Sequence, residues 1–548
     1  MRSKAVVVMA ALSAALATGG WFVGHGLEGQ AAPGGARLYQ DVLQHVAQFY
    51  VDSIPPDQLF EKSAAGMTRE LGDPHSAYLT PERLKRFTES TSGNYAGIGA
   101  RVDVRDGWVT IIDPIPGAAA ERAGLQPGDR IIEIAGESTR GWTADEATRR
   151  LRGTPGTRAQ FVVERPGVAA RIPVSVTRED VHIRSVQRVA LLRDGIGYLD
   201  VNVFSGETAA EVRQAVDSLR RLGAKSVVLD LRGNPGGLLD QGVSVADLFL
   251  QPGQSIVRMR GRTPEANQTY LDRNPAQYGG LPLVVLIDGG SASASEIVAG
   301  ALQDHDRALI MGATSYGKGS AQALFPLPES GGALKLTTAL WYTPVGRSIN
   351  RPIDAKAADD DDQGDDVAPP ADTTKAKPRE AYRTDAGRTV YGGGGITPDV
   401  VAGDTAATLA ELAFVRALGE KVRVFRDAVT AEALAIKGSG TLKGADFPVT
   451  PAMLESLYGR MKERGVAMDR ATYEGATPLV SRQLAYETAR YAFGADAEFR
   501  RRAADDAAIN SALALASGVA TQKDLFARAA ALPKKSGEPA RVPGGAGQ

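Results

Sequence analysis

Residues 283–296 read Leu-Val-Val-Leu-Ile-Asp-Gly-Gly-Ser-Ala-Ser-Ala-Ser-Glu. The apolar run 283–287 predicts a buried strand, and Ser293 followed three residues later by Glu296 is typical of a helix start. The same alternation of strand, turn and helix recurs over residues 181–352, which predicts an α/β layered domain. Functional residues of such a domain lie beyond the carboxyl ends of its strands, which is where these serines come.

A second predicted strand end carries a glycine turn. The apolar run 226–231 is followed by Arg232-Gly233-Asn234-Pro235-Gly236-Gly237, after which a helix is expected from Gly237 to Leu250. Pro-Gly-Gly after a strand is commonly only a turn. It equally suits the presentation of free backbone N–H groups at a helix start, which is what an oxyanion requires.

A lysine follows the serines on another glycine turn, Tyr316-Gly317-Lys318-Gly319. A serine and a lysine suffice for nucleophilic hydrolysis when the lysine is held neutral. Because free lysine titrates near about 10.4, desolvation would have to lower the pKa of Lys318. Taken alone, Ser293 is equally explained as the N-cap of a capping box. His305 is the rival base, in a segment that reads as a polar helix exit.

The composition, and motifs that the sequence lacks or matches only in part, argue against several other classes of protein. The 548 residues contain no cysteine and five scattered histidines without an HExxH pair, which argues against thiol and zinc chemistry. A formal net charge of -1 argues against a nucleic-acid partner. Residues 312–318 resemble the start of a phosphate-binding loop, but Gly319 stands where that loop needs Ser or Thr. No metal or cofactor is expected.

The first residues predict export. Arg2 and Lys4 precede an uncharged run from Ala5 to Phe22, which fits either a signal peptide or an uncleaved membrane anchor. By the positive-inside rule the body of the protein is expected to be periplasmic or extracytoplasmic, anchored in the inner membrane by this segment.

Residues 93–180 have the texture of short strands and tight turns. Gly97-Ile98-Gly99 leads into a strand, Asp106-Gly107 is a hairpin turn, residues 123–131 form a Gly-Leu-Gln-Pro-Gly-Asp block, and Thr143 begins a helix. This ordered set resembles a PDZ domain with the bacterial-protease arrangement. The resemblance implies capture of a peptide C-terminus by strand addition, with the N–H groups of Gly97, Ile98 and Gly99 on the carboxylate.

The combination of motifs resembles the C-terminal processing (tail-specific) serine protease family, over roughly residues 38–400. Three single residues belong to it: Ser293, Lys318, which follows 25 residues after Ser293, and Gln322, which follows four residues after Lys318. The combination also includes residues 229–237, residues 343–349 and the PDZ-like segment. The resemblance implies a crotonase-like α/β protease core with an inserted PDZ-like domain.

The resemblance also assigns roles to individual residues. Ser293 would be the nucleophile, Lys318 the general base and Gln322 the residue that orients the base. Lys318 and Gln322 become neighbours only in a helical turn, since in a strand they lie about 13 Å apart. The oxyanion donors implied are the N–H groups of Ala294 and of Gly236 or Gly237. Arg152 matches a position that senses bound peptide, and is equally explained as a solvated helix end.

The chain is expected to consist of consecutive segments. They are a leader or anchor with linker (1–35), N-terminal helices (36–92), the PDZ-like domain (93–180), the protease core (181–355 and 378–402), an acidic disordered insertion (356–377), a helical C-terminal appendage (403–533) and a disordered tail (534–548). The appendage is a candidate for homo-oligomer or adaptor contacts.

The function expected is an exported Ser/Lys endopeptidase that recognises protein C-termini and passes through an acyl-enzyme. Two alternatives belong to other classes. A catalytically inactive PDZ scaffold would lack the dyad, and a crotonase-like acyl-CoA enzyme would need neither Lys318 nor a PDZ-like module. The partners of the expected endopeptidase would be proteins or peptides with free C-termini.

Overall fold

The computed structural model describes residues 33–351, 379–403, 407–533 and 540–541. The apolar run 5–22, the acidic insertion expected at 356–377 and most of the tail expected at 534–548 lie outside these residues. In the described part of the chain, no helix is both long and apolar enough to cross a bilayer.

The chain divides into two compact units, and the first comprises Met1–Glu82 with Ala323–Leu336. Both amphipathic patterns of its sequence form helices, α2 (Pro33–Phe49) and α3 (Pro56–Arg69). A short strand, β1 (Ala77–Leu79), pairs antiparallel with residues 333–335 at the start of β18 (Gly332–Tyr342).

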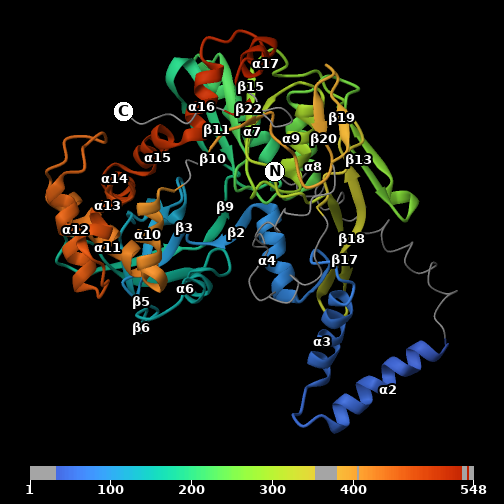
Figure 1. Ribbon diagram of the computed structural model, residues 1–548. Coiled ribbons are helices and arrows are strands. Elements are labelled where there is room, and N and C mark those ends of the chain that lie inside the picture. Colours follow the sequence, from blue (N-terminus) through green and yellow to red (C-terminus); the bar gives the residue numbers. More distant parts are fainter. Residues whose placement is uncertain (1–32, 352–378, 404–406, 534–539, 542–548) are drawn as a thin grey trace. The chain divides into compact units, whose positions relative to one another are not determined.

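The second unit, Arg83–Gln322 with Thr337–Gln548, contains the main sheet (Figure 1). Its strands pair in the order β10 (Val186–Leu191), β11 (Ile196–Val201), β12 (Ser226–Asp230), β15 (Leu283–Ile287), β16 (Leu309–Gly312), β21 (Val400–Val401) and β22 (Ala540–Arg541). All neighbours are parallel except β10 and β11. Asp230 pairs with Leu286, so the carboxyl ends of β12 and β15 lie side by side.

Alternate residues of these strands enter two different cores, as the period of a strand requires. Leu229 and Val285 face α7 (Thr208–Arg221), α8 (Leu239–Asp247) and α9 (Ala294–Asp304). Val228 and Val284 face the helices α15 (Ala495–Asp505), α16 (Ala507–Ala516) and α17 (Gln522–Ala530). These three helices lie in the region 403–533 predicted as an appendage, whereas they complete the core of the sheet.

The PDZ-like segment has a sheet of its own. Its strands pair in the order β3 (Ala100–Arg105), β4 (Trp108–Pro114), β5 (Arg130–Ile134), β7 (Arg158–Glu164) and β8 (Ile172–Thr177), with β6 (Glu137–Ser138) on β5. The helix α6 (Ala144–Leu151) begins at Thr143, whose hydroxyl accepts from the Glu146 N–H at 3.2 Å as the motif predicts. This helix contacts β3, which is the edge strand.

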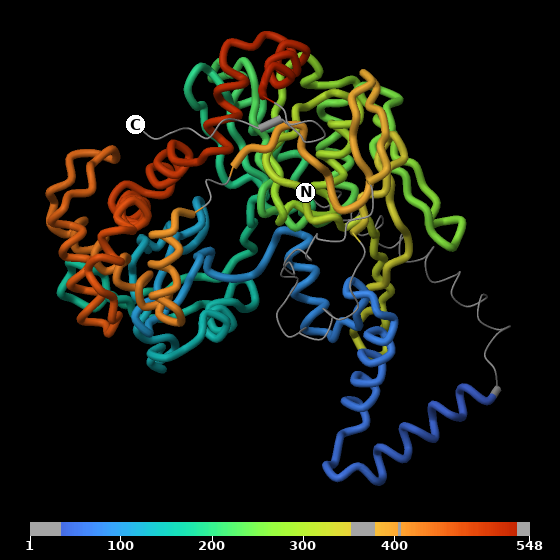
Figure 2. The backbone as a smooth tube through the Cα atoms, in the orientation of Figure 1, coloured from blue at the N-terminus to red at the C-terminus, as the bar shows by residue number. Residues whose placement is uncertain are grey.

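Five helices that follow β21 in the sequence form a further core. They are α10 (Leu409–Leu418), α11 (Val422–Gly438), α12 (Pro451–Glu463), α13 (Arg470–Gly475) and α14 (Thr477–Phe493). Phe414, Leu457 and Leu484 are buried among them. Figure 2 shows this region in orange beside the PDZ-like segment in blue and cyan, and ion pairs between the two are described below.

The remaining elements are α4 (Pro81–Ser92), β2 (Asn94–Gly97), α5 (Ala119–Arg122), β9 (Glu179–His182), β13 (Ser255–Gly261), β14 (Gln268–Leu271), β17 (Ser320–Leu327), β19 (Ala381–Arg383) and β20 (Thr389–Tyr391). The strands β13 and β17 each pair with β18, β14 pairs with β13, β2 with β9, and β19 with β20. The segment 343–349 is tied to the end of α9, because the fully buried Arg347 guanidinium donates to Asp304 at 2.5 Å and 3.0 Å.

Candidate active site

Ser293 lies at a sharp turn between β15 and α9. Its backbone has φ +52° and ψ −113°, a conformation that costs a non-glycine residue about 1–3 kcal/mol. Of residues 291–300, Ser293 is the only one that is not buried. A strained turn from strand to helix that exposes a serine is the arrangement of a nucleophile elbow, reached here without the GxSxG sequence.

The other two serines of the stretch serve the fold. The Ser291 hydroxyl donates to the Leu231 carbonyl at 2.8 Å and accepts from the Asp288 N–H at 2.9 Å. The Ser295 hydroxyl donates to the Asn234 carbonyl at 3.0 Å. Both side chains are fully buried. Within the triplet, Ser293 is therefore the only serine that is not buried, and its role as nucleophile stays a prediction.

The capping box expected from Ser293 and Glu296 is present. The Glu296 carboxylate accepts from the Ser293 N–H at 2.8 Å. The Glu296 N–H also donates to the Ser293 carbonyl oxygen at 2.9 Å. Because the Glu296 N–H has this backbone acceptor, it stays hydrogen-bonded when the Ser293 hydroxyl turns away from the cap.

Glu296 does more than close a capping box, and this was missed at the level of sequence. One carboxylate oxygen accepts from the Ser315 hydroxyl and the Gly317 N–H, each at 2.6 Å. The other accepts from the Ser293 N–H at 2.8 Å and the Lys318 N–H at 2.9 Å. One carboxylate thus holds the backbones of both residues of the predicted dyad. The signal available was an acid in the first turn of a helix whose next six residues, 297–302, are apolar.

The electrostatics of Glu296 follow from its position. Its side chain is fully buried, and this burial raises the pKa of the Glu296 carboxyl above its ordinary value. The hydrogen bonds from Ser315, Gly317, Lys318 and Ser293 oppose that rise. Every one of these groups can donate, so the ionised carboxylate is the form that the site is built to hold.

The glycine turn after β12 lies against the serine. A Cβ at Gly236 would be 2.8 Å from the Ser293 Cβ, and its φ of +100° also favours glycine. The Gly236 N–H donates to the Asn234 side-chain oxygen at 2.8 Å. The Gly237 N–H has no hydrogen-bond partner among the described residues. The helix α8 begins at Leu239, two residues later than the sequence predicts.

Gln322 is not brought to Lys318 by a helical turn. Residues 320–327 form the strand β17. The helical turn that would make Lys318 and Gln322 neighbours is therefore not present. The Gln322 amide nitrogen donates to the Ser320 hydroxyl at 3.0 Å and to the Thr337 hydroxyl at 3.1 Å. The orienting role of Gln322 stays a prediction.

His305 is occupied at both ring nitrogens. Nδ1 lies 2.7 Å from the Asp385 carboxylate and Nε2 lies 2.8 Å from the Ser255 carbonyl oxygen. Its side chain is 9% exposed. A histidine whose two nitrogens are both hydrogen-bonded elsewhere has none to offer a serine, so His305 is a structural residue at the end of α9.

The predicted tail-binding loop is only partly a loop, because Gly97 is the last residue of β2 and pairs with Glu179, whereas Ile98 and Gly99 lie between β2 and β3. Gly99 has φ +77°, and a Cβ there would lie 2.3 Å from the Ala118 Cβ. The Ile98 side chain is buried in the PDZ-like core. Arg152 is not a solvated helix end, because its guanidinium lies 4.8 Å from the Tyr95 ring centroid and forms an ion pair with Glu89.

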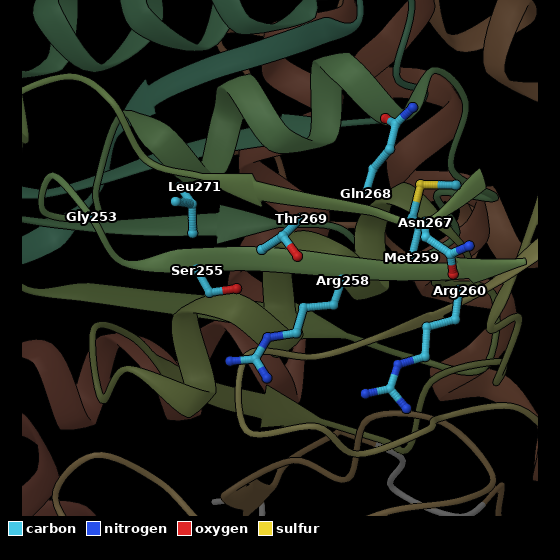
Figure 3. Close-up of a pocket in the computed structure, with 9 residues that line it drawn as sticks. All are labelled: Gly253, Ser255, Arg258, Met259, Arg260, Asn267, Gln268, Thr269 and Leu271. Atoms are coloured by element: carbon cyan, nitrogen blue, oxygen red, sulfur yellow. The ribbon is translucent and has the colours of Figure 1, made fainter. Parts of the chain in front are cut away.

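A hollow of about 590 Å³ lies on the β13–β14 hairpin (Figure 3). Its lining includes Arg258 and Arg260, whose side chains lie along the same strand. None of the predicted site residues lines it, so this hollow is not the candidate active site.

Comparisons with known proteins agree with this arrangement. The family model described as peptidase family S41 matches residues 195–356, and a PDZ domain model matches residues 110–165. A carboxy-terminal-processing protease of Bartonella bacilliformis is 42% identical over 320 residues, which are 57% of this chain and 71% of that protein. This chain belongs to the carboxy-terminal processing proteases of family S41. It is therefore a serine-type peptidase with a PDZ domain.

Other similar proteins carry related names. The carboxy-terminal processing protease CtpA of Bacillus subtilis is 35% identical over 310 residues, which are 56% of this chain and 65% of that protein. Among solved structures, a photosystem II D1 C-terminal processing protease is 29% identical and covers 57% of this chain and 90% of its own, with a TM-score of 0.33.

Replacing Glu296 with Gln tests the role of this carboxylate in the peptidase. The amide puts an NH₂ group opposite two of the present donors, so the backbones of Ser293 and Lys318 shift apart. We expect kcat for an unstructured peptide to fall about 100-fold, as a displacement near 1 Å does, with KM little changed. Steady-state kinetics measure this.

Ser315→Ala is the matched control, since it removes one donor and leaves the carboxylate. It should retain kcat within about tenfold. Equal losses in Glu296→Gln and Ser315→Ala, or an unchanged kcat in Glu296→Gln, would contradict a positioning role.

Proposed function

We propose that this peptidase is an exported endopeptidase that uses Ser293 as nucleophile and Lys318 as general base, and that selects substrates by their C-terminal ends. The observation that carries the proposal is the shared carboxylate oxygen. Glu296 Oε2 accepts from the Ser293 N–H at 2.8 Å and from the Lys318 N–H at 2.9 Å, so the two residues start from neighbouring backbones. The core is proposed to be crotonase-like.

The proposed reaction has two halves. The Ser293 hydroxyl oxygen attacks the carbonyl carbon of the scissile bond while its proton passes to neutral Lys318. The tetrahedral intermediate collapses to an acyl-enzyme as the C–N bond breaks, and Lys318 returns the proton to the leaving amine. Water then attacks the ester, Lys318 takes its proton, and the Ser293 oxygen leaves with that proton.

The N–H groups of Ala294 and Gly237 are proposed to hold the oxyanion. Ala294 is the first residue of α9, so its N–H precedes the intrahelical ladder and lies at the positive end of the helix dipole. Gly237 is favoured over Gly236, because the Gly236 N–H already donates to Asn234. Such donors act on charge that develops in the transition state.

Tail selection is proposed to use the loop Gly97-Ile98-Gly99 at the start of β3. Both glycines are required by close packing, because a Cβ at Gly97 would lie 2.8 Å from the Tyr95 ring and a Cβ at Gly99 would lie 2.3 Å from the Ala118 Cβ. The edge position of β3 beside α6 supports strand addition by an extended peptide. Membership of family S41 argues against the acyl-CoA enzyme, and the following experiments test the proposed dyad and the proposed tail selection.

Ser293→Ala should abolish peptide hydrolysis while the protein stays folded. The change removes the nucleophile and at most one cap, worth about 1 kcal/mol. Ser291→Ala and Ser295→Ala are the controls and should remain active, since those hydroxyls serve the fold. Hydrolysis rates and thermal unfolding measure both effects. A dead Ser295→Ala beside an active Ser293→Ala would show that the nucleophile is misassigned.

Lys318→Arg should be as inactive as Lys318→Ala. A guanidinium stays protonated at any working pH and cannot accept the serine proton. Hydrolysis rates at pH 7 to 9 measure this, with thermal unfolding of each variant as a check on folding. Turnover by Lys318→Arg within tenfold of the native enzyme would eliminate the dyad.

C-terminal amidation of a substrate should slow its cleavage. The amidated tail loses the charge that the loop 97–99 is proposed to bind, while the scissile bond is unchanged. Rates of cleavage for free-acid and amidated versions of one peptide, below saturation, measure the effect, which we expect to be at least about tenfold. Equal rates would show that this PDZ domain does not read the tail.

A further inference from the structure

The free edge of β3 is closed at Val104 by the C-terminal helices. The strand β3 turns into β4 through Asp106 and Gly107, both with positive φ, and Arg105 pairs with Trp108 across this two-residue turn. Residues that flank such a turn exchange both ladder hydrogen bonds, so the next residue, Val104, directs its N–H and C=O away from β4.

Both edge groups of Val104 already have partners. Its N–H donates to the side-chain oxygen of Asp103 at 2.7 Å. Its carbonyl oxygen accepts from Nη2 of Arg426, on α11, at 3.1 Å. The same guanidinium forms an ion pair with Asp103 at 3.1 Å through Nη1. Arg426 and Asp103 thus occupy the groups that an added strand would use.

The helices around Arg426 are attached to this hairpin by further contacts. The Asp106 N–H donates to the Asp427 carboxylate at 3.2 Å, and Arg464, at the end of α12, donates to the Asp106 carboxylate at 3.1 Å. Gly128 of the PDZ-like segment approaches Leu434, since a Cβ there would lie 3.0 Å from it. Arg426 is therefore placed by a packed interface between the two regions.

We propose that Arg426 and Asp103 set the length of tail that the PDZ domain reads. This inference rests on tail binding at the loop 97–99. A tail that adds antiparallel from that loop meets edge groups at every second residue, at Val102 and then at Val104. Its pairing stops at about the fifth residue from the end, where Arg426 takes the place of the substrate's N–H. Upstream residues leave β3 at that point.

Peptide binding to full-length Ser293→Ala protein tests this proposal. Two fluorescent peptides share the same last four residues, one being four and the other eight residues long. With the edge closed, the two should bind with Kd values within about twofold of each other. In the further variant Asp103→Ala/Arg426→Ala the edge groups of Val104 keep only the 3.4 Å contact of Arg105 Nη1 with the carbonyl oxygen, and the longer peptide should bind about fivefold or more tightly than the shorter.

Arg464→Ala is the matched control, because it breaks a contact of the same interface and leaves both edge groups of Val104 covered. Arg464→Ala should bind the four-residue and the eight-residue peptide with similar affinity. The proposal would be overturned if the longer peptide bound more tightly than the shorter one to the parent protein. It would also be overturned if Arg464→Ala showed the same increase in affinity with length as Asp103→Ala/Arg426→Ala, or if that double variant showed none. If the four-residue peptide binds none of these proteins, tail recognition itself fails, and this inference fails with it.

Discussion

The buried carboxylate of Glu296 is the interaction on which the candidate site depends. It joins the turn that carries Ser293 to the segment that carries Ser315, Gly317 and Lys318, through four hydrogen bonds of 2.6–2.9 Å. Burying a charge is costly unless donors compensate it, and here the compensating donors belong to the residues that need placing. The stability of this cluster and the geometry of the proposed dyad therefore have one cause.

The strained backbone of Ser293 is maintained by the same surroundings. Gly236 packs against the serine from the neighbouring strand end, where any side chain would collide. The turn that carries Gly236 is tied to the C-terminal helices, because Arg232 donates to Asp230 at 2.6 Å and forms a 2.9 Å ion pair with Asp506. The last helices of the chain thus contact both the strand end beside the proposed oxyanion donors and, through Arg426, the edge of the PDZ domain.

Local signals in the sequence were sufficient for the strands β12 and β15 and, to within two residues, for the helix starts that follow them. The runs at 226–231 and 283–287 form neighbouring strands because apolar patterning and glycine turns act over a few residues. The helical turn needed between Lys318 and Gln322 was not formed, because residues 320–327 pair with β18 as a strand. Such pairing depends on segments that local spacing does not specify.

Partners distant in sequence account for the other differences. The capping box identified Glu296 as a local partner of Ser293, but its bonds to residues 315–318 depend on the tertiary fold. The partners of His305 lie 50 and 80 residues away along the chain. The C-terminal helices read as an appendage because an amphipathic pattern does not reveal which sheet it will cover.

Mapping the residue modified by a fluorophosphonate is the most direct test of this account. Intact mass should show one adduct, and peptide mapping should place it on Ser293, with modification slowed strongly in Lys318→Ala and Glu296→Gln. An adduct on another serine of the active protein, or equally fast modification of Ser293 in both variants, would contradict a nucleophile activated by Lys318 and held by Glu296.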